Sequence, residues 1–137
     1  MKLLLDTHVW LWSVAEPERL APTMRSCLEN PDTELWLSPM SIWELVMLAQ
    51  KGRVELDVPV AQWVVDAQEL VTLREAPVTR EVALETALVD AAHKDPADRF
   101  LVATARVFGL RLATADGRLL RDAKIDTLAA AGSAHRR

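Results

Sequence analysis

Cysteine is almost absent from this sequence, and its scarcity excludes a disulfide-stabilised fold. The one cysteine, Cys27, has no partner for an internal disulfide, and no cysteine or histidine stands near it at metal-binding spacing. Such a composition suits a reducing compartment. We therefore expect a cytoplasmic protein in which Cys27 is a small, partly buried residue.

Long apolar runs are also missing. No stretch approaches the roughly 20 apolar residues that a membrane-spanning helix needs. The opening leucines, Leu3 to Leu5, are followed at once by Asp6, whereas a signal peptide needs an apolar stretch of about 7–15 residues. Internal repeats, low-complexity segments and linkers are absent as well. The 137 residues are therefore expected to form a single domain that does not associate with a membrane.

An excess of positive charge is missing too, since 20 acidic against 16 basic residues give a net charge of −4. Phosphate binding favours lysine and arginine, so this balance weakens the case for broad electrostatic binding of DNA. Five acids stand apart by their position, however, and removing five from 20 leaves 15 acids against 16 bases. The charge balance therefore still permits phosphate binding that is mediated by divalent ions.

Segments typical of strands and of helices alternate along the chain. Short, continuously apolar segments predict buried strands, and longer segments with helical periodicity or capping signals predict helices. We expect strands at 2–5, 34–37, 112–115 and 125–128, with 70–73 as a further candidate. We expect helices at 8–15, 22–29, 39–50, 60–69, 80–92 and 95–108. This alternation predicts an α/β fold in which helices cover both faces of a parallel sheet.

The five acids occupy positions where such a sheet gathers its functional groups. Asp6 and Asp116 each follow an apolar strand, and three more acids lie near the starts of helices, namely Glu44, Asp95 and Asp98. Ligands of open α/β sheets bind beyond the carboxyl ends of the strands, so we expect these acids to converge. Two unit charges about 4 Å apart repel by roughly 4 kcal/mol at an effective dielectric near 20. Convergence therefore favours a bound divalent cation, and hard oxygen ligands favour Mg²⁺ or Mn²⁺.

Each acid also has a purely structural interpretation. Glu44 can complete a capping box at the start of its helix. Asp95 can cap the next helix, with Asp98 favoured in its first turn by the helix dipole. Asp116 can belong to a turn. Asp6 has no cap or turn signature around it, and the coincidence of all five positions favours one shared site.

The order and spacing of these motifs resemble those of PIN-domain proteins, in particular the VapC-type ribonuclease toxins of bacterial toxin–antitoxin pairs. The resemblance rests on four segments, 2–8 (KLLLDTH), 37–54, 93–99 (HKDPADR) and 114–116 (TAD). It implies a small doubly wound parallel sheet flanked by helices. It also implies that residues 1–128 form a single PIN-like nuclease domain and that residues 129–137 form a flexible tail.

The resemblance further implies which acids act in catalysis. The acidic quartet of the family, whose members hold Mg²⁺ or Mn²⁺, matches Asp6, Glu44, Asp98 and Asp116. Asp95 is either a supplementary metal ligand or a helix cap. One departure is visible at Ala97, where the subfamily usually has an aromatic residue. This departure bears on the shape of the substrate groove, and so on substrate preference, rather than on catalysis.

Other residues are candidates for supporting roles. Thr7 and Thr114 match family positions where a hydroxyl supports the acids. Arg99 and Lys94 can meet neighbouring phosphates, although a solvated face explains either residue equally well. His8 and His93 are weaker candidates for acid–base groups, because neither has a histidine or cysteine partner at ligand spacing.

Two of the tryptophans stand close together on the helix expected at 8–15. Trp10 and Trp12 cannot both face one core from a single short helix. One of them is therefore expected at a partner interface, where tryptophan is enriched, or as a platform on which RNA bases stack.

Residues and resemblance together predict a Mg²⁺- or Mn²⁺-dependent endoribonuclease that hydrolyses RNA phosphodiester bonds as a toxin. Carboxylate-held cations polarise the phosphate and activate water for in-line attack. The resemblance implies a homodimer and a VapB-type antitoxin as partner. The alternative is a catalytically silent PIN-like module that binds RNA or protein, against which the intact acids argue. A phosphoaspartyl enzyme is disfavoured because His8 stands where its second aspartate is required.

Overall fold

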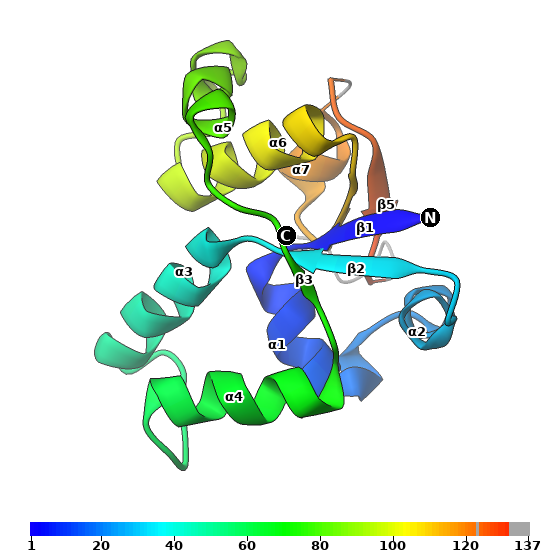
Figure 1. The fold of residues 1–137 in the computed structure, drawn as a ribbon, viewed down its shortest axis with the longest axis vertical. Coiled ribbons are helices and arrows are strands. Elements are labelled where there is room, and N and C mark those ends of the chain that lie inside the picture. The colour runs from blue at the N-terminus through cyan, green and yellow to red at the C-terminus, as the bar shows by residue number, and fades with distance from the viewer. Residues whose placement is uncertain (123, 132–137) are drawn as a thin grey trace.

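Five parallel strands form the centre of the computed structural model, which describes residues 1–122 and 124–131 (Figure 1). Their order across the sheet is β3-β2-β1-β4-β5, and every strand pair is parallel. The strands are Lys2–Leu5 (β1), Glu34–Leu37 (β2), Arg74–Glu75 (β3), Arg111–Thr114 (β4) and Thr127–Ala129 (β5). The predicted α/β fold, a small doubly wound parallel sheet, is thereby confirmed.

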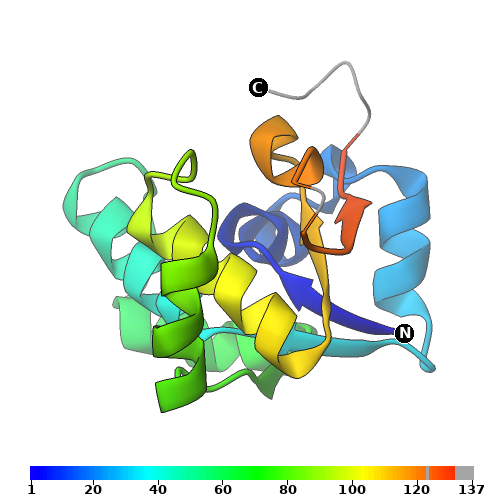
Figure 2. The same cartoon turned by 90° about the horizontal axis from the view of Figure 1, so that it is seen from above.

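Helices cover both faces of this sheet (Figure 2). The α-helices are Thr7–Ala15 (α1), Pro22–Glu29 (α2), Pro39–Gln50 (α3), Val60–Leu70 (α4), Arg80–Glu85 (α5), Pro96–Phe108 (α6) and Gly117–Leu120 (α7). Two short 3₁₀ helices follow α1 and α5, at Pro17–Arg19 (η1) and Thr86–Leu88 (η2). None of the helices among the described residues is long and apolar enough to cross a membrane.

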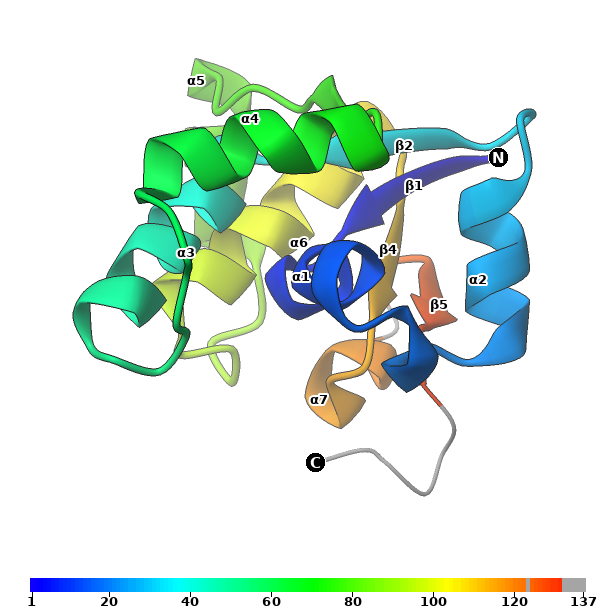
Figure 3. The same ribbon diagram turned by 90° about the horizontal axis from the view of Figure 1, so that it is seen from below.

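The leucine run of β1 is continuous because the strand is buried on both faces. Leu3 and Leu5 point into one apolar cluster, which includes buried residues of α1, α2, α3 and α4. Leu4 points into a second cluster on the opposite face, formed with α5, α6 and α7. All three leucines are fully buried, and each such burial contributes about 1.5–3 kcal/mol to folding. Figure 3 shows α1 and α4 on one side of the strands, with α6 beyond them.

Two predicted elements differ from the structure. The candidate strand at 70–73 is absent, because Leu70 still belongs to α4 and the strand that pairs with β2 begins only at Arg74. The helix expected at 80–92 ends at Leu88. Beyond it, the backbone carbonyls of Val89, Asp90 and His93 accept hydrogen bonds from the Arg99 guanidinium, which holds the chain in a loop.

The domain also extends beyond the boundary expected at residue 128. Strand β5 includes Ala129, and the next residue, Ala130, is fully buried. The amide of Ala130 donates to the carbonyl of Thr114 at 2.9 Å, and its carbonyl accepts from the amide of Ala21 at 2.9 Å. Residues 129–131 are therefore part of the fold rather than of a tail. The remainder of the expected tail, 132–137, lies outside the described residues.

The chain changes direction across the sheet between β1 and β4. From β1 it proceeds to β2 and β3 on one side, and it later returns to place β4 and β5 on the other. In open α/β sheets, such a switch point leaves a crevice beyond the carboxyl ends of the two strands. Asp6 follows β1 directly, and Asp116 lies two residues beyond the end of β4. The topology therefore places both acids at this crevice.

Candidate functional site

A pocket of about 610 Å³ opens at this switch point, and all five singled-out acids line it. They are Asp6, Glu44, Asp95, Asp98 and Asp116. They reach the pocket from the end of β1, from α3, from the start of α6 and from the start of α7. The sequence-based expectation that these acids converge agrees with this arrangement.

Asp6 is the most deeply placed of the acids. Its amide donates to the carbonyl of Ala113 at 3.0 Å, which ties the end of β1 to β4. Its Oδ2 accepts a 2.6 Å hydrogen bond from Oγ1 of Thr114, a fully buried residue. The same hydroxyl oxygen accepts from the amide of Asp116 at 3.0 Å. Thr114 thus connects two of the acids and fixes the carboxylate of Asp6, the supporting role expected for this hydroxyl.

Glu44 is held by the other predicted hydroxyl. Thr7, at the start of α1, donates from Oγ1 to Oε1 of Glu44 at 2.5 Å and shares a 2.9 Å hydrogen bond with Oγ of Ser41. The start of α3 is capped by Ser38, whose Oγ accepts from the amide of Met40 at 3.0 Å. Glu44 therefore takes no part in a capping box, and its carboxylate is directed to the pocket.

The remaining acids stand at helix starts. Two of them, Asp95 and Asp116, cap a helix and also line the pocket. Asp95 caps α6 by accepting from the amide of Ala97 at 3.0 Å, with Asp98 in the first turn. Asp116 caps α7 by accepting from the amide of Arg118 at 2.8 Å. Each capping bond uses a single carboxylate oxygen. The structural and functional interpretations of these acids are thus compatible.

The pocket is electrostatically strained. Burial, and after it the negative charges of four neighbouring carboxylates, together raise the pKa of Asp98 to about 7; the four are Asp6, Asp95, Asp116 and Glu44. Burial likewise raises the pKa of Asp6 and of Glu44 above their ordinary values, against the hydrogen bonds from the two threonines. Negative charge in this pocket is therefore disfavoured until a cation or a proton neutralises it.

The donor set suits a hard divalent cation. Among residues 1–122 and 124–131, no group of three or more histidine, cysteine, aspartate or glutamate side chains is arranged to hold a metal ion by itself. Mg²⁺, however, keeps several of its waters and commonly binds through only one or two carboxylates. A pocket walled by carboxylates meets that requirement, and a closed cage is not needed. The residues present therefore fit Mg²⁺ or Mn²⁺.

The two predicted phosphate contacts do not line the pocket. Lys94 is exposed in the loop before α6. Arg99 turns its guanidinium away from the acids and donates to the carbonyls of Thr86, Val89, Asp90 and His93 at 2.7–3.4 Å. Its donors are thus occupied within the fold, so this geometry gives no support to a phosphate contact by either residue.

Three arginines that sequence reasoning did not single out line the pocket instead. They are Arg19, Arg118 and Arg121, and all three side chains are exposed. The guanidinium of Arg19 lies 4.4 Å from the ring centroid of Trp12, over its face. Arg118 and Arg121 stand three residues apart on and just after α7. The spacing of this pair after Asp116 would have indicated them, had α7 been predicted from the sequence.

The tryptophan pair on α1 divides as its spacing requires. Trp10 is 2% exposed and packs edge-to-face against Trp63, with the ring centroids 5.4 Å apart. Trp12 is half-buried and lines the acidic pocket together with His8. Trp10 is thus a core residue, whereas the half-buried Trp12 packs at the edge of the same apolar cluster and also borders the pocket.

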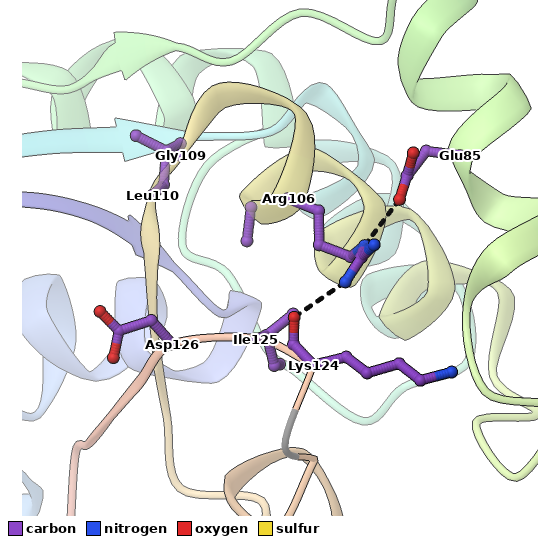
Figure 4. Close-up of a pocket in the computed structure, with 8 residues that line it drawn as sticks. Glu85, Arg106, Gly109, Leu110, Lys124, Ile125 and Asp126 are labelled. Atoms are coloured by element: carbon purple, nitrogen blue, oxygen red, sulfur yellow. Dashed lines mark hydrogen bonds and ion pairs between the residues drawn. The ribbon is translucent and has the colours of Figure 1, made fainter.

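Another cavity, of about 490 Å³, lies at the C-terminal end of α6 (Figure 4). Glu85 and Asp126 are its acids, and they are balanced by Arg106 and Lys124. An ion pair of 2.6 Å joins Nε of Arg106 to Oε2 of Glu85. This cavity thus lacks the uncompensated carboxylates of the acidic pocket, which remains the candidate site.

Comparisons with known proteins agree with this geometry. The PIN domain family model matches residues 3–125. Ribonuclease VapC22 of Mycobacterium tuberculosis is 41% identical over 118 residues, which cover 85% of this chain and 88% of that relative.

Solved structures show the same fold at lower identity. One is VapBC2 of Rickettsia felis bound to a DNA fragment from its promoter, with a TM-score of 0.70 at 10% identity, covering 95% of this chain and 99% of that one. Another is DNA-bound VapBC of Salmonella typhimurium, with a TM-score of 0.70 at 19% identity, covering 94% and 98%. At these identities, the likeness concerns the fold alone.

Proposed function

Since the chain belongs to the PIN-domain family, we propose that it is a VapC-type ribonuclease toxin whose acidic pocket cleaves RNA with a divalent cation. The observation that carries this proposal is the gathering of five carboxylates, from segments far apart in the sequence, around one pocket. A relative with 41% identity over most of the chain bears the name of a ribonuclease, which supports the same conclusion.

The proposed ligands of Mg²⁺ or Mn²⁺ are Asp6, Glu44, Asp98 and Asp116, with Asp95 as a supplementary ligand. A divalent cation at this position supplies positive charge that polarises a phosphodiester and makes water a stronger nucleophile near neutral pH. The chain itself orients the carboxylates: Thr114 fixes Asp6, and Thr7 fixes Glu44. These hydroxyls hold the acids in place before any cation or substrate arrives.

We also propose that the three exposed arginines lining the pocket, here called the rim arginines, hold the RNA backbone. Arg19 stands on one element bordering the pocket, and Arg118 and Arg121 stand on and after α7. Guanidinium groups bind phosphate oxygens in pairs, and phosphates on either side of the cleaved bond would meet them at the rim. Trp12, which Arg19 covers, is suited to contact a base or sugar next to these phosphates.

The proposed partner is a VapB-type antitoxin, because both VapBC structures described above contain toxin and antitoxin together. A homodimer is the proposed assembly. Leu84 and Leu88, on α5 and η2, are 68% and 61% exposed, and a second copy would cover such apolar side chains. Analytical sedimentation that shows only monomer at high protein concentration would contradict the dimer.

Cleavage of a structured RNA in the presence of Mg²⁺ or Mn²⁺ tests the function. The purified protein is expected to cleave it, and both a chelator and the substitution Asp6→Ala are expected to abolish cleavage. Asp57→Ala, which removes an exposed acid outside the pocket, serves as the matched control and should cleave normally.

Two outcomes would contradict this expectation. Cleavage that survives both the chelator and Asp6→Ala would point to a contaminating nuclease. Tight RNA binding without cleavage at any metal concentration would favour the silent binding module instead.

A further inference from the structure

A buried histidine–aspartate pair lies beside the acidic pocket but does not line it. Nε2 of His93 is 2.7 Å from Oδ2 of Asp122, and the two side chains are 7% and 6% exposed. Burial opposes ionisation of Asp122, yet hydrogen bonds from the amide of Lys124 and from His93 hold its pKa below the ordinary value. A charged carboxylate is therefore kept inside the fold by two hydrogen bonds, in an arrangement that the proposed chemistry does not use.

The pair joins the two segments that carry three of the pocket acids. His93 lies two residues before Asp95, the cap of α6, and Asp122 lies two residues after the end of α7, which Asp116 caps. Among the described residues, it is the only hydrogen bond between segment 86–99 and segment 116–122. The start of α6 and the region of α7 are thus fastened to each other at this one polar contact.

Both ends of this contact are firmly anchored. On one side, the carbonyl of His93 accepts from Nη1 of Arg99 at 3.1 Å, and its amide donates to the carbonyl of Asp90 at 3.0 Å. On the other side, the amide of Asp122 donates to the carbonyl of Leu119 at 3.1 Å. Displacing either side chain would therefore displace the helix end to which it is attached, namely the start of α6 or the end of α7.

A force that separates these helix starts is present in the same place. Asp95 and Asp98 stand at the start of α6, and Asp116 at the start of α7, so their negative charges repel across the pocket. Among the described residues, no ion pair reaches Asp95 or Asp98 from a lysine, arginine or histidine. Without a counteracting tether, repulsion would widen the pocket until a cation arrived.

We propose that His93 and Asp122 form a positioning latch that fastens the loop before α6 to the segment after α7, so that the acids of both helices can share one cation. The latch rests on the proposed function, because it serves the same pocket. Neither residue touches the cation or the RNA. Their effect is on the arrangement of the carboxylates. That arrangement sets the Mg²⁺ concentration at which cleavage is half-maximal.

The substitution Asp122→Ala tests the latch. We expect the Mg²⁺ concentration that gives half-maximal cleavage to rise about 10–100-fold, as for other groups that orient metal ligands. The cleavage rate at saturating Mg²⁺ should fall much less. Independently of activity, amide hydrogen exchange in the chelated protein should become faster for residues 93–100.

Asp122→Asn separates the latch from a general loss of folding. An asparagine can accept from the amide of Lys124 and donate to Nε2 of a neutral His93, so both bonds to this position persist. This variant is expected to restore the metal requirement to within a few-fold of the wild type. A metal requirement as high as that of Asp122→Ala would overturn the latch.

Glu85→Ala is the matched control, because it breaks an ion pair at the opposite end of α6 from His93. Arg106 of α6 binds Glu85 and also donates from Nη1 to the carbonyl of Lys124 at 2.9 Å (Figure 4). Loss of Glu85 should lower thermal stability without changing the metal requirement.

The outcomes distinguish the latch from the proposed function. If the wild type cleaves RNA but Asp122→Ala needs no more Mg²⁺ than it does, the latch is wrong. An equal shift in Glu85→Ala would also overturn it, since any loosening of α6 would then suffice. If the wild type neither cleaves RNA nor binds Mg²⁺ in calorimetry, the proposed function fails instead.

Discussion

Asp6 is a buried carboxylate whose hydrogen-bond partner is neutral. It is 9% exposed and accepts from the hydroxyl of Thr114, and among the described residues no cationic side chain forms an ion pair with it. Buried charges are normally paired or bound to metals, because an isolated one is strongly disfavoured. The same holds for Glu44, whose partner is the hydroxyl of Thr7. At the level of single residues, Asp6 and Glu44 therefore lack a cationic partner, although arginines line the pocket and one of them, Arg118, lies 3.9 Å from Asp116.

Asp98→Asn should separate metal binding from folding. The substitution removes one negative charge from a carboxylate whose pKa burial and its acidic neighbours raise to about 7. In a chelator, the variant is expected to melt at the same temperature as the wild type or higher, because repulsion is relieved. Its affinity for Mg²⁺ should fall at least about 10-fold, with a comparable loss of cleavage. Calorimetric titration with Mg²⁺ that shows an unchanged affinity would remove Asp98 from the proposed ligands.

The rim arginines should be visible in the salt dependence of RNA binding. Each phosphate contact with a single strand contributes about 0.7 to the slope of log affinity against log salt. The double substitution of Arg118 and Arg121 by alanine is therefore expected to weaken binding in a chelator and to flatten this slope by about 1.4. Arg80→Ala, on the exposed start of α5, is the control and should leave the slope unchanged. An unaltered slope in the double variant would place the RNA elsewhere.

At the scale of elements, the sequence predicts those segments in which local signals agree with the tertiary structure. The helix from Pro39 to Gln50 and the helix from Pro96 to Phe108 each begin with a capping side chain and a proline, and both are found at the expected residues. Helix α7 was not predicted because it spans four residues, Gly117–Leu120, too few to display a period. The end of the predicted helix 80–92 depends on Arg99, which no local pattern reveals.

The end of α6 offers a test of backbone conformation alone. Gly109 has φ of +65°, and a Cβ placed there would meet no atom within 4 Å. Gly109→Ala should therefore lower the free energy of unfolding by about 1–2 kcal/mol, because an L residue disfavours the left-handed region. Urea denaturation measures this loss. Gly52→Ala, at φ of +71° after α3 and equally free of neighbours, should show a similar loss. Two variants as stable as the wild type would contradict the assigned conformations.

At the scale of the whole molecule, the candidate site follows from the topology more than from any single motif. The sequence placed acids at strand ends and helix starts, and parallel pairing in the order β3-β2-β1-β4-β5 brings those ends to one edge. The arginine rim and the His93–Asp122 pair could not be predicted in this way. His93 and Asp122 are 29 residues apart in the sequence, and their contact exists only once the loop before α6 meets the segment after α7 in the fold.

The acidic pocket should couple the stability of the whole molecule to pH and to metal. The pKa of Asp98 is raised from 3.8 to about 7, chiefly by burial, and the pKa values of Asp6 and Glu44 are raised in the same direction. Below pH 3.8, Asp98 is protonated in both the folded and unfolded states, so its shift changes nothing. Between pH 3.8 and about 7, only the unfolded chain releases the proton, so stability falls as pH rises. Above about 7 the loss is complete.

We therefore expect the melting temperature of the metal-free wild type, relative to that of Asp98→Asn, to fall as pH rises from 5 to 8. Partial exposure of Asp98 lets solvent screen part of the effect. The corresponding change in the free energy of unfolding should therefore be on the order of 1 kcal/mol. Saturating Mg²⁺ should reverse the trend, because a cation binds the ionised carboxylates of the folded state and competes with protons. The comparison with Asp98→Asn cancels the contribution of the other carboxylates. A pH-independent difference in the chelator, or one that Mg²⁺ leaves unchanged, would mean that the five acids do not act as one cation site.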